Sequence, residues 1–416
     1  MKRGNGMNIV IKSLLLILIL CLNFASVVFS ASPCRKGVSG RLYPCNGVHL
    51  LGNVSLKDFE KFSGFQIPAA GSLWGYVDPK DQREYALLGL YGGTGVVEVT
   101  HPKKPRIVGF VPRVGSFAKE IKIYTSTDSL AGERRAYAYS VTDDLAPGDS
   151  GIQIIDLSSL PDSVSLLQTD HDLEYGHTLF ISNVDFGTGE KLAGLTPYLY
   201  VQGTDKGGIV AFSLEDPENP NILGIYSEPV HDIYAETFND VRVKGCASGH
   251  TPCEIVFAWG GANVRIIDFT DKNAPALLSK KGWPKPGYSH SGWISSDKKW
   301  LFNFDEFDEV DHRLNTRIPV MNISNFKRPK LRKIWKGPTG ETEHNGIVVG
   351  NKLYLAHYTR GLVILDATNP KKMQEIGFFD TCPNSCRGAW GVYPFLPSGS
   401  ILISDINRGL FILKEK

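Results

Sequence analysis

Seven short apolar runs recur along this chain, and each follows a glycine or another turn residue. The runs begin about 43 to 57 residues apart. A repeat of this length is typical of propellers and solenoids. Because a unit made of a few strands cannot bury its own faces, it must pack against further copies of itself. The runs begin at Gly95, Gly151, Gly208, Asn263, Ile318, Gly361 and Gly409.

The segments around each run indicate four strands per repeat. A turn rich in Asp, Asn and Pro follows most runs, as in Glu215-Asp-Pro-Glu-Asn-Pro, and an outer strand such as Asn221-Ile-Leu-Gly-Ile-Tyr comes next. Asp and Asn cap such turns through their side chains, and proline fixes φ. The 43 glycines and 24 prolines fit a turn-rich chain of strands. Four strands per unit make a propeller blade. The sequence therefore predicts an all-β, seven-bladed β-propeller.

The last repeat lacks an outer strand, because the chain stops soon after Gly409-Leu-Phe-Ile-Leu. The segment Gly47-Val-His-Leu-Leu-Gly-Asn-Val-Ser, upstream of the first repeat, resembles the missing strand. An uncovered strand edge invites aggregation. We therefore expect the N-terminal strand to complete the last blade. The expected divisions are a signal peptide over 1–30, a disulfide segment with the closing strand over 31–70, and the propeller over 71–416.

The first thirty residues have the three parts of a secretory signal peptide. A basic start at Lys2 and Arg3 precedes a short apolar run, and Ser30 offers a small residue for cleavage. A membrane anchor is the alternative, but the run is short for a span. No second long apolar run and no C-terminal anchor tail follow. We expect a secreted, extracellular protein with no membrane span after cleavage.

Cleavage would also change the charge. Residues 1–30 carry three basic side chains and no acidic one, so the formal charge of +2 becomes about −1. Such a chain has no basic face for nucleic acid. We expect a monomer whose partner is an extracellular ligand or protein.

The six cysteines that remain fall into three neighbouring pairs, Cys34 with Cys45, Cys246 with Cys253, and Cys382 with Cys386. An even number of cysteines in an exported chain indicates disulfides, and local pairing is the simplest arrangement. A zinc site is the alternative, and it would need the pairs to converge. Asn53 and Asn322 begin glycosylation sequons that would be used in a eukaryotic host.

The candidate site comes from the first residues of the expected innermost strands, which surround the channel of a propeller. Equivalent positions of a ring face one axial region, so these side chains should share a face. Four histidines recur at this position, and tryptophan opens the first and last blades. The candidate binding residues are Trp74, His177, His231, His290, His344 and Trp390.

Three interpretations of the histidines stay open. They could bond to backbone carbonyls between blades and do nothing else. They could bind one divalent metal ion, because neutral imidazole is the commonest metal ligand. They could also act as acid or base on a ligand in the channel mouth. The candidate metal ligands are His177, His231, His290, His344, Asp305 and Glu306.

The two carboxylates of that set belong to the most acidic segment, Phe304-Asp-Glu-Phe-Asp-Glu. Alternate residues of a strand share a face, so Asp305 and Glu306 cannot both point at the channel without a bulge or turn. The segment lacks the length and the central glycine of an EF-hand loop. It could ligate calcium, or it could be a solvated loop paired with Arg313 or Arg317. No nucleophile elbow, phosphate-binding loop or His-Glu-x-x-His motif is present.

Longer motifs resemble the choice-of-anchor B family of secreted proteins with LVIVD-type repeats. The resemblance covers nearly all of the chain after residue 30 and implies an exported β-propeller, with no established catalytic activity to carry over. The second repeat departs from the family at Phe117-Ala-Lys-Glu-Ile-Lys, where Trp-Arg-Asp is usual. The motifs are Trp74-Gly-Tyr-Val-Asp-Pro, Ser289-His-Ser-Gly-Trp, Phe304-Asp-Glu-Phe-Asp-Glu, Tyr358-Thr-Arg-Gly-Leu-Val-Ile-Leu-Asp and Gly388-Ala-Trp-Gly-Val-Tyr-Pro-Phe-Leu-Pro-Ser-Gly.

These observations favour a secreted binding or interaction module that holds a ligand or ion at the channel face lined by histidines. A secreted metal-assisted hydrolase using the same residues is the alternative. A purely structural extracellular component is a third interpretation. The identity of the ligand does not follow from the sequence.

Overall fold

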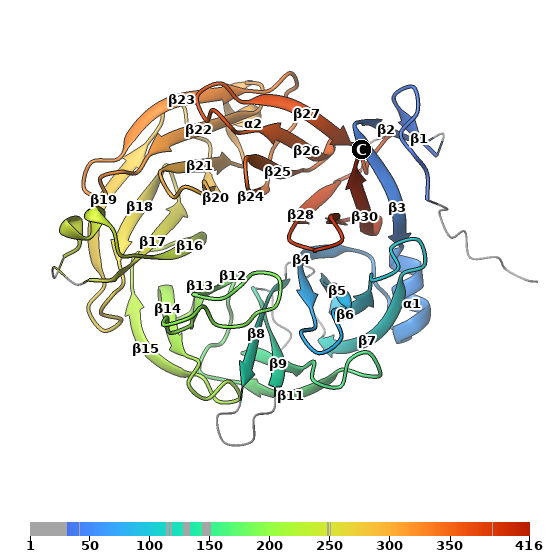
Figure 1. The fold of residues 1–416 in the computed structure, drawn as a ribbon, viewed down its shortest axis with the longest axis horizontal. Coiled ribbons are helices and arrows are strands. Elements are labelled where there is room, and N and C mark those ends of the chain that lie inside the picture. The colour runs from blue at the N-terminus through green and yellow to red at the C-terminus, as the bar shows by residue number, and fades with distance from the viewer. Residues whose placement is uncertain are drawn as a thin grey trace, which may run out of the picture.

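The computed structural model describes residues 31–40, 42–113, 116, 119–127, 134–143, 151–247, 249, 251–384 and 386–416. The predicted signal peptide, 1–30, lies outside the described residues. Seven antiparallel sheets stand around a central axis as the blades of a propeller (Figure 1). The prediction of a seven-bladed, all-β propeller is confirmed.

Six blades take their four strands from consecutive segments of the chain, ordered from the axis outward. The strands of the first four blades are β4 (Ala70–Val77), β5 (Glu84–Leu90), β6 (Gly92–Glu98) and β7 (Arg106–Arg113); β8 (Lys119–Thr127), β9 (Arg134–Thr142), β10 (Ile152–Asp156) and β11 (Ser165–Asp170); β12 (Thr178–Ser182), β13 (Tyr198–Thr204), β14 (Gly207–Ser213) and β15 (Asn221–Tyr226); β16 (Asp232–Phe238), β17 (Cys253–Gly260), β18 (Asn263–Asp268) and β19 (Ala276–Gly282).

The last three blades follow the same order, and the seventh borrows its outer strand. They comprise β20 (Ser289–Ile294), β21 (Trp300–Asp305), β22 (Arg317–Asn322) and β23 (Lys330–Lys336); β24 (Asn345–Val349), β25 (Lys352–His357), β26 (Gly361–Asp366) and β27 (Gln374–Phe379); β28 (Ala389–Tyr393), β29 (Ser400–Asp405), β30 (Gly409–Glu415) and β3 (Val48–Val54).

The seven apolar runs of the sequence supply the third strand of each blade. Neighbouring blades cover both faces of these strands, so both side-chain faces are apolar and the strands are almost fully buried. In β26, for example, the five residues from Gly361 to Leu365 are all buried. A strand buried on both faces is a continuous apolar run and does not alternate. Among the described residues the stacked blades form two apolar clusters, a large one with members in every blade and a smaller one in the second and third blades.

Two outer strands, β15 and β3, carry a glycine where the next blade comes close. A Cβ on Gly224 would lie 1.7 Å from the carbonyl oxygen of Lys272, and a Cβ on Gly52 would lie 2.1 Å from that of Pro102. Both positions need glycine because neighbouring backbone already occupies the space. The same relation in β15 and in β3 shows that β3 takes the place of an outer strand.

The N-terminal segment closes the ring. β3 pairs antiparallel with β30, from Val48 opposite Glu415 to Val54 opposite Leu410, which confirms the predicted closing strand. The segment also adds two strands that the sequence did not predict, β1 (Val38–Ser39) and β2 (Tyr43–Asn46). β2 pairs with β27 and extends the sixth blade (Figure 1).

Short helices occupy connections outside the sheets. They are α1 (Leu56–Ser63), the 3₁₀ helix η1 (Val241–Gly245) and α2 (Asp308–His312). Among the described residues, no helix has the length and apolarity needed to cross a membrane. The three neighbouring cysteine pairs form disulfides, which confirms local pairing. They are Cys34–Cys45, Cys246–Cys253 and Cys382–Cys386.

Candidate functional site

The four candidate histidines lie in one row at the start of four neighbouring inner strands. Consecutive ring centroids are 4.5 Å apart from His177 to His231, 4.2 Å from His231 to His290 and 4.3 Å from His290 to His344. The indole of Trp390 continues the row, 4.3 Å from His344. The propeller thus places side chains from five consecutive blades in contact on one face.

Hydrogen bonds fix how three of these rings are oriented. His231 donates from Nδ1 to the carbonyl oxygen of His290 at 3.0 Å, and His344 donates from Nδ1 to that of Trp390 at 2.7 Å. The Nδ1 of His290 lies 3.1 Å from the hydroxyl oxygen of Ser291, which itself donates to the carbonyl of His344. We assign the tautomers from these bonds. Each neutral ring then carries its lone pair on Nε2.

The fourth ring, His177, has a different partner at each nitrogen. Its Nδ1 lies 2.8 Å from Oδ2 of Asp143, and its Nε2 lies 2.8 Å from Nε2 of His231. Because the Nε2 of His231 is an acceptor, both nitrogens of His177 must carry protons. Burial alone would lower the pKa of His177, but the Asp143 carboxylate outweighs it and holds the pKa above its usual value. His177 and Asp143 therefore form an ion pair at one end of the row.

His231 lies next to the charged His177 ring, is largely shielded from solvent, and stays neutral. Burial is the largest cause that lowers its pKa, to about 3, and the charge of His177 adds to it. Burial also lowers the pKa of His290 well below its usual range and lowers that of His344. Neutral imidazole is the form that ligates metal ions.

One carboxylate joins two of the neutral rings. A ligand atom from each of His290, Glu306 and His344 lies within 4.8 Å of the other two. The Nε2 of His290 is 3.8 Å from Oε2 of Glu306, whose Oε1 accepts a hydrogen bond from the Tyr358 hydroxyl at 2.7 Å. The side chains of His290 and Glu306 are 5% and 15% exposed, so the group is largely buried but keeps some contact with solvent. These three residues could hold one metal ion.

Asp305 points away from this group. Its Oδ2 accepts from Nε1 of Trp283 at 2.8 Å, and its Oδ1 accepts from the backbone amides of Gly287 and Tyr288 at 3.0 and 2.7 Å. The carboxylate is fully buried and holds the loop before β20 against β21. Asp305 and Glu306 thus diverge, as alternation along a strand requires. Asp305 has no free oxygen to offer beside His290.

We expected all six candidate side chains to share a face, but the two tryptophans lie at different depths. Trp390 contacts His344 at the mouth, whereas Trp74 packs 5.2 Å from Tyr393 and 6.0 Å from Phe186. The pairing of β4 with β5 shifts register between Ala70 and Leu73. The irregularity places Ser72 beside the histidines and moves Trp74 inward.

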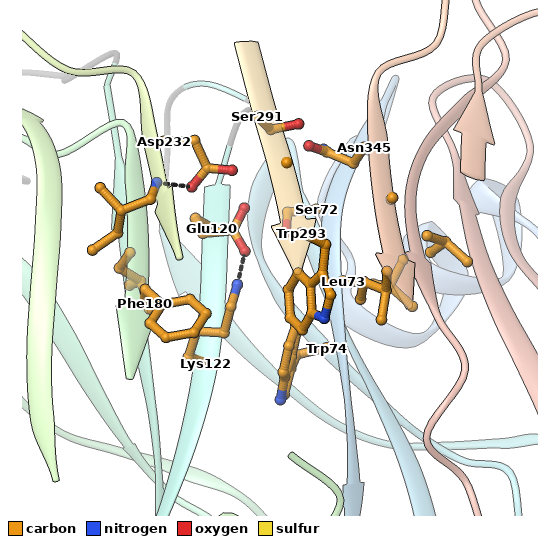
Figure 2. A pocket seen from close by; sticks show the side chains of 17 residues that line it. Ser72, Leu73, Trp74, Glu120, Lys122, Phe180, Asp232, Ser291, Trp293 and Asn345 are labelled. Atoms are coloured by element: carbon orange, nitrogen blue, oxygen red, sulfur yellow. Dashed lines mark hydrogen bonds and ion pairs between the residues drawn. The ribbon is translucent and has the colours of Figure 1, made fainter. Parts of the chain in front are cut away.

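Below the histidines is a cavity of about 70 Å³ with charged walls. Figure 2 shows Glu120 pointing at Lys122, with which it pairs, and Asp232 of β16 on the same side of the cavity. The Lys122 ammonium lies 4.4 Å from the ring centroid of Trp74. Burial, and then the charge of Glu120, raise the pKa of Asp232 to about 7. The cavity therefore contains one ion pair and one carboxyl that can gain or lose a proton near neutral pH.

Sequence reasoning missed these channel groups. Glu120 and Lys122 stand two positions apart in the inner strand of the second blade, so their alternation was a signal for one shared face. The opening of that blade departs from the family motif, and none of its residues was among the candidates. Asp143 follows β9, and no local pattern connects it with His177, thirty-four positions further on.

The chain matches no protein-family model and no curated protein sequence. Three solved structures are similar to it in fold. A protein from Lactobacillus plantarum has a TM-score of 0.51 at 14% identity, covering 80% of this chain and 88% of its own. YCF48, solved bound to D1 peptide, has a TM-score of 0.50 at 10% identity, covering 85% and 94%. Sqt1 of Saccharomyces cerevisiae has a TM-score of 0.51 at 9% identity, covering 84% and 97%.

At these identities the similarity shows the fold alone. The class is that of β-propellers with seven blades, a fold commonly used for binding and interaction.

Proposed function

We propose that this protein is a secreted binding module that takes up one divalent metal ion at the channel mouth through His290, Glu306 and His344. The observation that carries the proposal is the convergence of these three ligand atoms within 4.8 Å. Two imidazoles and one carboxylate are a ligand set used for zinc, and they leave a position open for a further ligand.

The surroundings of the three residues favour metal binding. Metal-ligating histidines usually donate their other ring N–H to a carbonyl or another acceptor, which orients the ring. The Nδ1 atoms of His290 and His344 have such acceptors, and the Tyr358 hydroxyl donates a hydrogen bond to Glu306, which orients that carboxylate. His177 and His231 stand outside the ligand set in this proposal, because each has both ring nitrogens engaged.

Secretion and family membership are part of the proposal. Three disulfides suit an oxidising compartment. The signal-like segment over 1–30 would direct export, and the resemblance of the repeat motifs to the choice-of-anchor B family supports membership of that family. Expression of the full sequence in a secreting host tests export, with the mature N-terminus expected at residue 31. Retention of the protein inside the cell would contradict it.

Zinc titration of the purified protein tests the metal site. After chelation and dialysis, calorimetry should give one zinc ion per chain. Glu306→Gln and His344→Ala should each lower the affinity by more than about 100-fold, because each removes a ligand. His101→Ala is the matched control, because His101 is an exposed surface histidine. Equal zinc binding by Glu306→Gln and the unaltered protein would refute the site.

A metal-assisted hydrolase is the second candidate, and the carboxyl of Asp232 favours it. This group lines the same channel and has a pKa of about 7, which suits a general acid or base near neutral pH. Zinc-loaded protein should then hydrolyse an activated ester faster than the metal-free form. Asp232→Asn should remove that difference while zinc still binds. If zinc does not increase the rate of ester hydrolysis, binding alone remains as the function.

A further inference from the structure

The outer edge of the fifth blade carries a dense block of basic side chains. Residues 324–340 include six lysines and arginines and no acidic residue. Four of the six belong to β23, the outermost strand of its sheet (Figure 1). All six residues are exposed. They are Lys327, Arg328, Lys330, Arg332, Lys333 and Lys336.

The neighbouring blade adds two lysines to this block. Trp335 donates from Nε1 to the carbonyl oxygen of Met373 at 3.1 Å, so the turn before β27 lies against β23. This turn carries Lys371 and Lys372, which are both exposed. They line an open groove of about 690 Å³ together with lysines of β23. We call the eight basic residues of these two segments the basic rim.

No carboxylate neutralises the basic rim. In the parts of the chain that the structure describes, none of its eight residues forms an ion pair, whereas other exposed lysines do, such as Lys280 with Glu228 at 2.8 Å. Glu375 of β27 follows the two lysines of the turn closely in sequence, but it is bonded to Arg360. Because like charges without counter-charges reinforce one another, this surface has a positive potential that attracts anions.

The basic rim corrects an expectation drawn from the net charge. A formal charge of about −1 after cleavage predicted no basic face. That sum is correct for the whole chain, but it conceals positive charge that is concentrated on one blade. The segment from Lys327 to Lys336 was the available signal, because short segments rich in lysine and arginine are typical of patches that bind polyanions.

Protection of a strand edge does not account for the basic rim. Lysine on an outermost strand can prevent pairing with other chains. However, β11 and β15 are also outermost strands, and neither contains a lysine or an arginine. Lys371 and Lys372 lie in a turn and not on a strand edge. The concentration of charge therefore indicates an anionic partner.

We propose that the basic rim binds an acidic polysaccharide, a polymer whose sugars carry sulfate or carboxylate groups. Because successive residues of a strand are about 3.3 Å apart, the basic residues of β23 extend over about 20 Å. An open array of this length fits a linear polymer with repeated charges. A single small anion would instead need a few donors that converge in an enclosed pocket.

The choice of a polysaccharide over a nucleic acid rests on the proposed export of the protein. The basic rim and the channel mouth lie at opposite ends of the fifth blade, because β23 is its outermost strand and β20, which carries His290, is its innermost. Binding through the basic rim would leave the channel mouth open to solution. The protein could thus stay attached to an extracellular polymer while it takes up its metal ion.

Titration of the purified protein with heparin, polygalacturonate and a DNA duplex tests the proposal. Heparin carries sulfates and polygalacturonate carries carboxylates, so the two probes identify the anionic group. At least one of them should bind more tightly than the duplex. Its affinity should fall at least about 10-fold from about 50 to about 200 mM sodium chloride, because salt screens exposed charges. Tighter binding of the duplex, or no binding of either polysaccharide, would overturn the proposal.

A variant with three substitutions locates the surface. Lys330→Gln, Lys333→Gln and Lys336→Gln together should lower the affinity for the polysaccharide at least about 30-fold, because each lysine near an anionic surface contributes roughly fivefold. The melting temperature should not change, because all three side chains are exposed. Zinc binding should not change either, so this result is independent of the outcome at the metal site.

The matched control removes the same charge near the first blade. Lys57 lies in α1, Lys103 and Lys104 lie in the turn before β7, and all three are exposed. Their joint replacement by glutamine should lower the affinity less than about 3-fold, because screening weakens the effect of distant charges. Equal weakening in the two variants would show that binding follows the net charge and not the basic rim, and it would refute the proposal.

Discussion

The Nδ1 atom of His344 lies 2.7 Å from the carbonyl oxygen of Trp390, in the next blade around the ring. His231 bridges to His290 in the same way. The same imidazole can therefore join two blades through Nδ1 and offer Nε2 to a ligand. Two of the three interpretations of the sequence, backbone partner and metal ligand, are compatible in one side chain.

Paired substitutions at His344 should separate these two roles. Asparagine places a donor near the position of Nδ1, so His344→Asn should stay within about 1 kcal/mol of the original stability but lose zinc. Glutamine reaches the position of Nε2, so His344→Gln should lose the bond to Trp390 at a cost of about 1–3 kcal/mol. Urea unfolding and zinc titration of both variants make the comparison. Equal stability of the two would contradict a bridging role.

The ion pair of His177 and Asp143 should make stability depend on pH in a defined direction. The folded pKa of His177 is raised, so the pair stabilises fully below the unfolded value of about 6.5 and is lost as pH rises through the folded value. The stability difference between the unaltered protein and Asp143→Asn should therefore be largest near pH 5.5 and shrink above neutrality. Chemical unfolding at several pH values measures it. A difference that grows with pH would refute the charged state of His177.

Replacing Asp305 should lower the stability of the fold but have little effect on zinc binding. In Asp305→Asn one oxygen becomes an NH₂ donor, which must face either the indole N–H of Trp283 or the amides of Gly287 and Tyr288. The donors left without an acceptor should lower the free energy of unfolding by about 2–4 kcal/mol. Zinc affinity of the folded protein should change little, in contrast to Glu306→Gln. Equal losses of zinc affinity in both variants would show that Asp305 does support the ligands.

The glycine of the closing strand should resist substitution. In Gly52→Ala the new methyl group would overlap the carbonyl oxygen of Pro102, and relief requires the first and last blades to separate slightly. We expect the free energy of unfolding to fall by about 2–4 kcal/mol, as measured by thermal unfolding. Gly245→Ala is the control, because nothing lies nearer than 3.9 Å to its added carbon. Similar losses in both variants would show that closure at β3 is unimportant for stability.

Most of what was predicted from sequence rests on features that recur from blade to blade. The third strands are continuous apolar runs, and the histidines recur at one position of the inner strand, so periodicity alone placed His231 beside His290. Several features that occur once were missed. The register shift in β4 moved Trp74 inward, and Asp143 meets His177 through a contact that no spacing rule describes. The repeats in the sequence therefore reveal the architecture. The polar contacts that determine which side chains are charged differ from blade to blade, so they leave no repeating pattern.

The closing strand also has a consequence for biosynthesis. Asn53 in β3 donates to the carbonyl oxygen of Leu410 in β30, its neighbour across 357 positions of the chain. β3 is therefore among the first segments of the ring to be translated, and its partner is among the last. Until synthesis is almost finished, β3 and the first blade have an unsatisfied edge, and the nascent chain must be kept from pairing with other chains in the meantime. Molecular chaperones would be needed most by this protein during that interval.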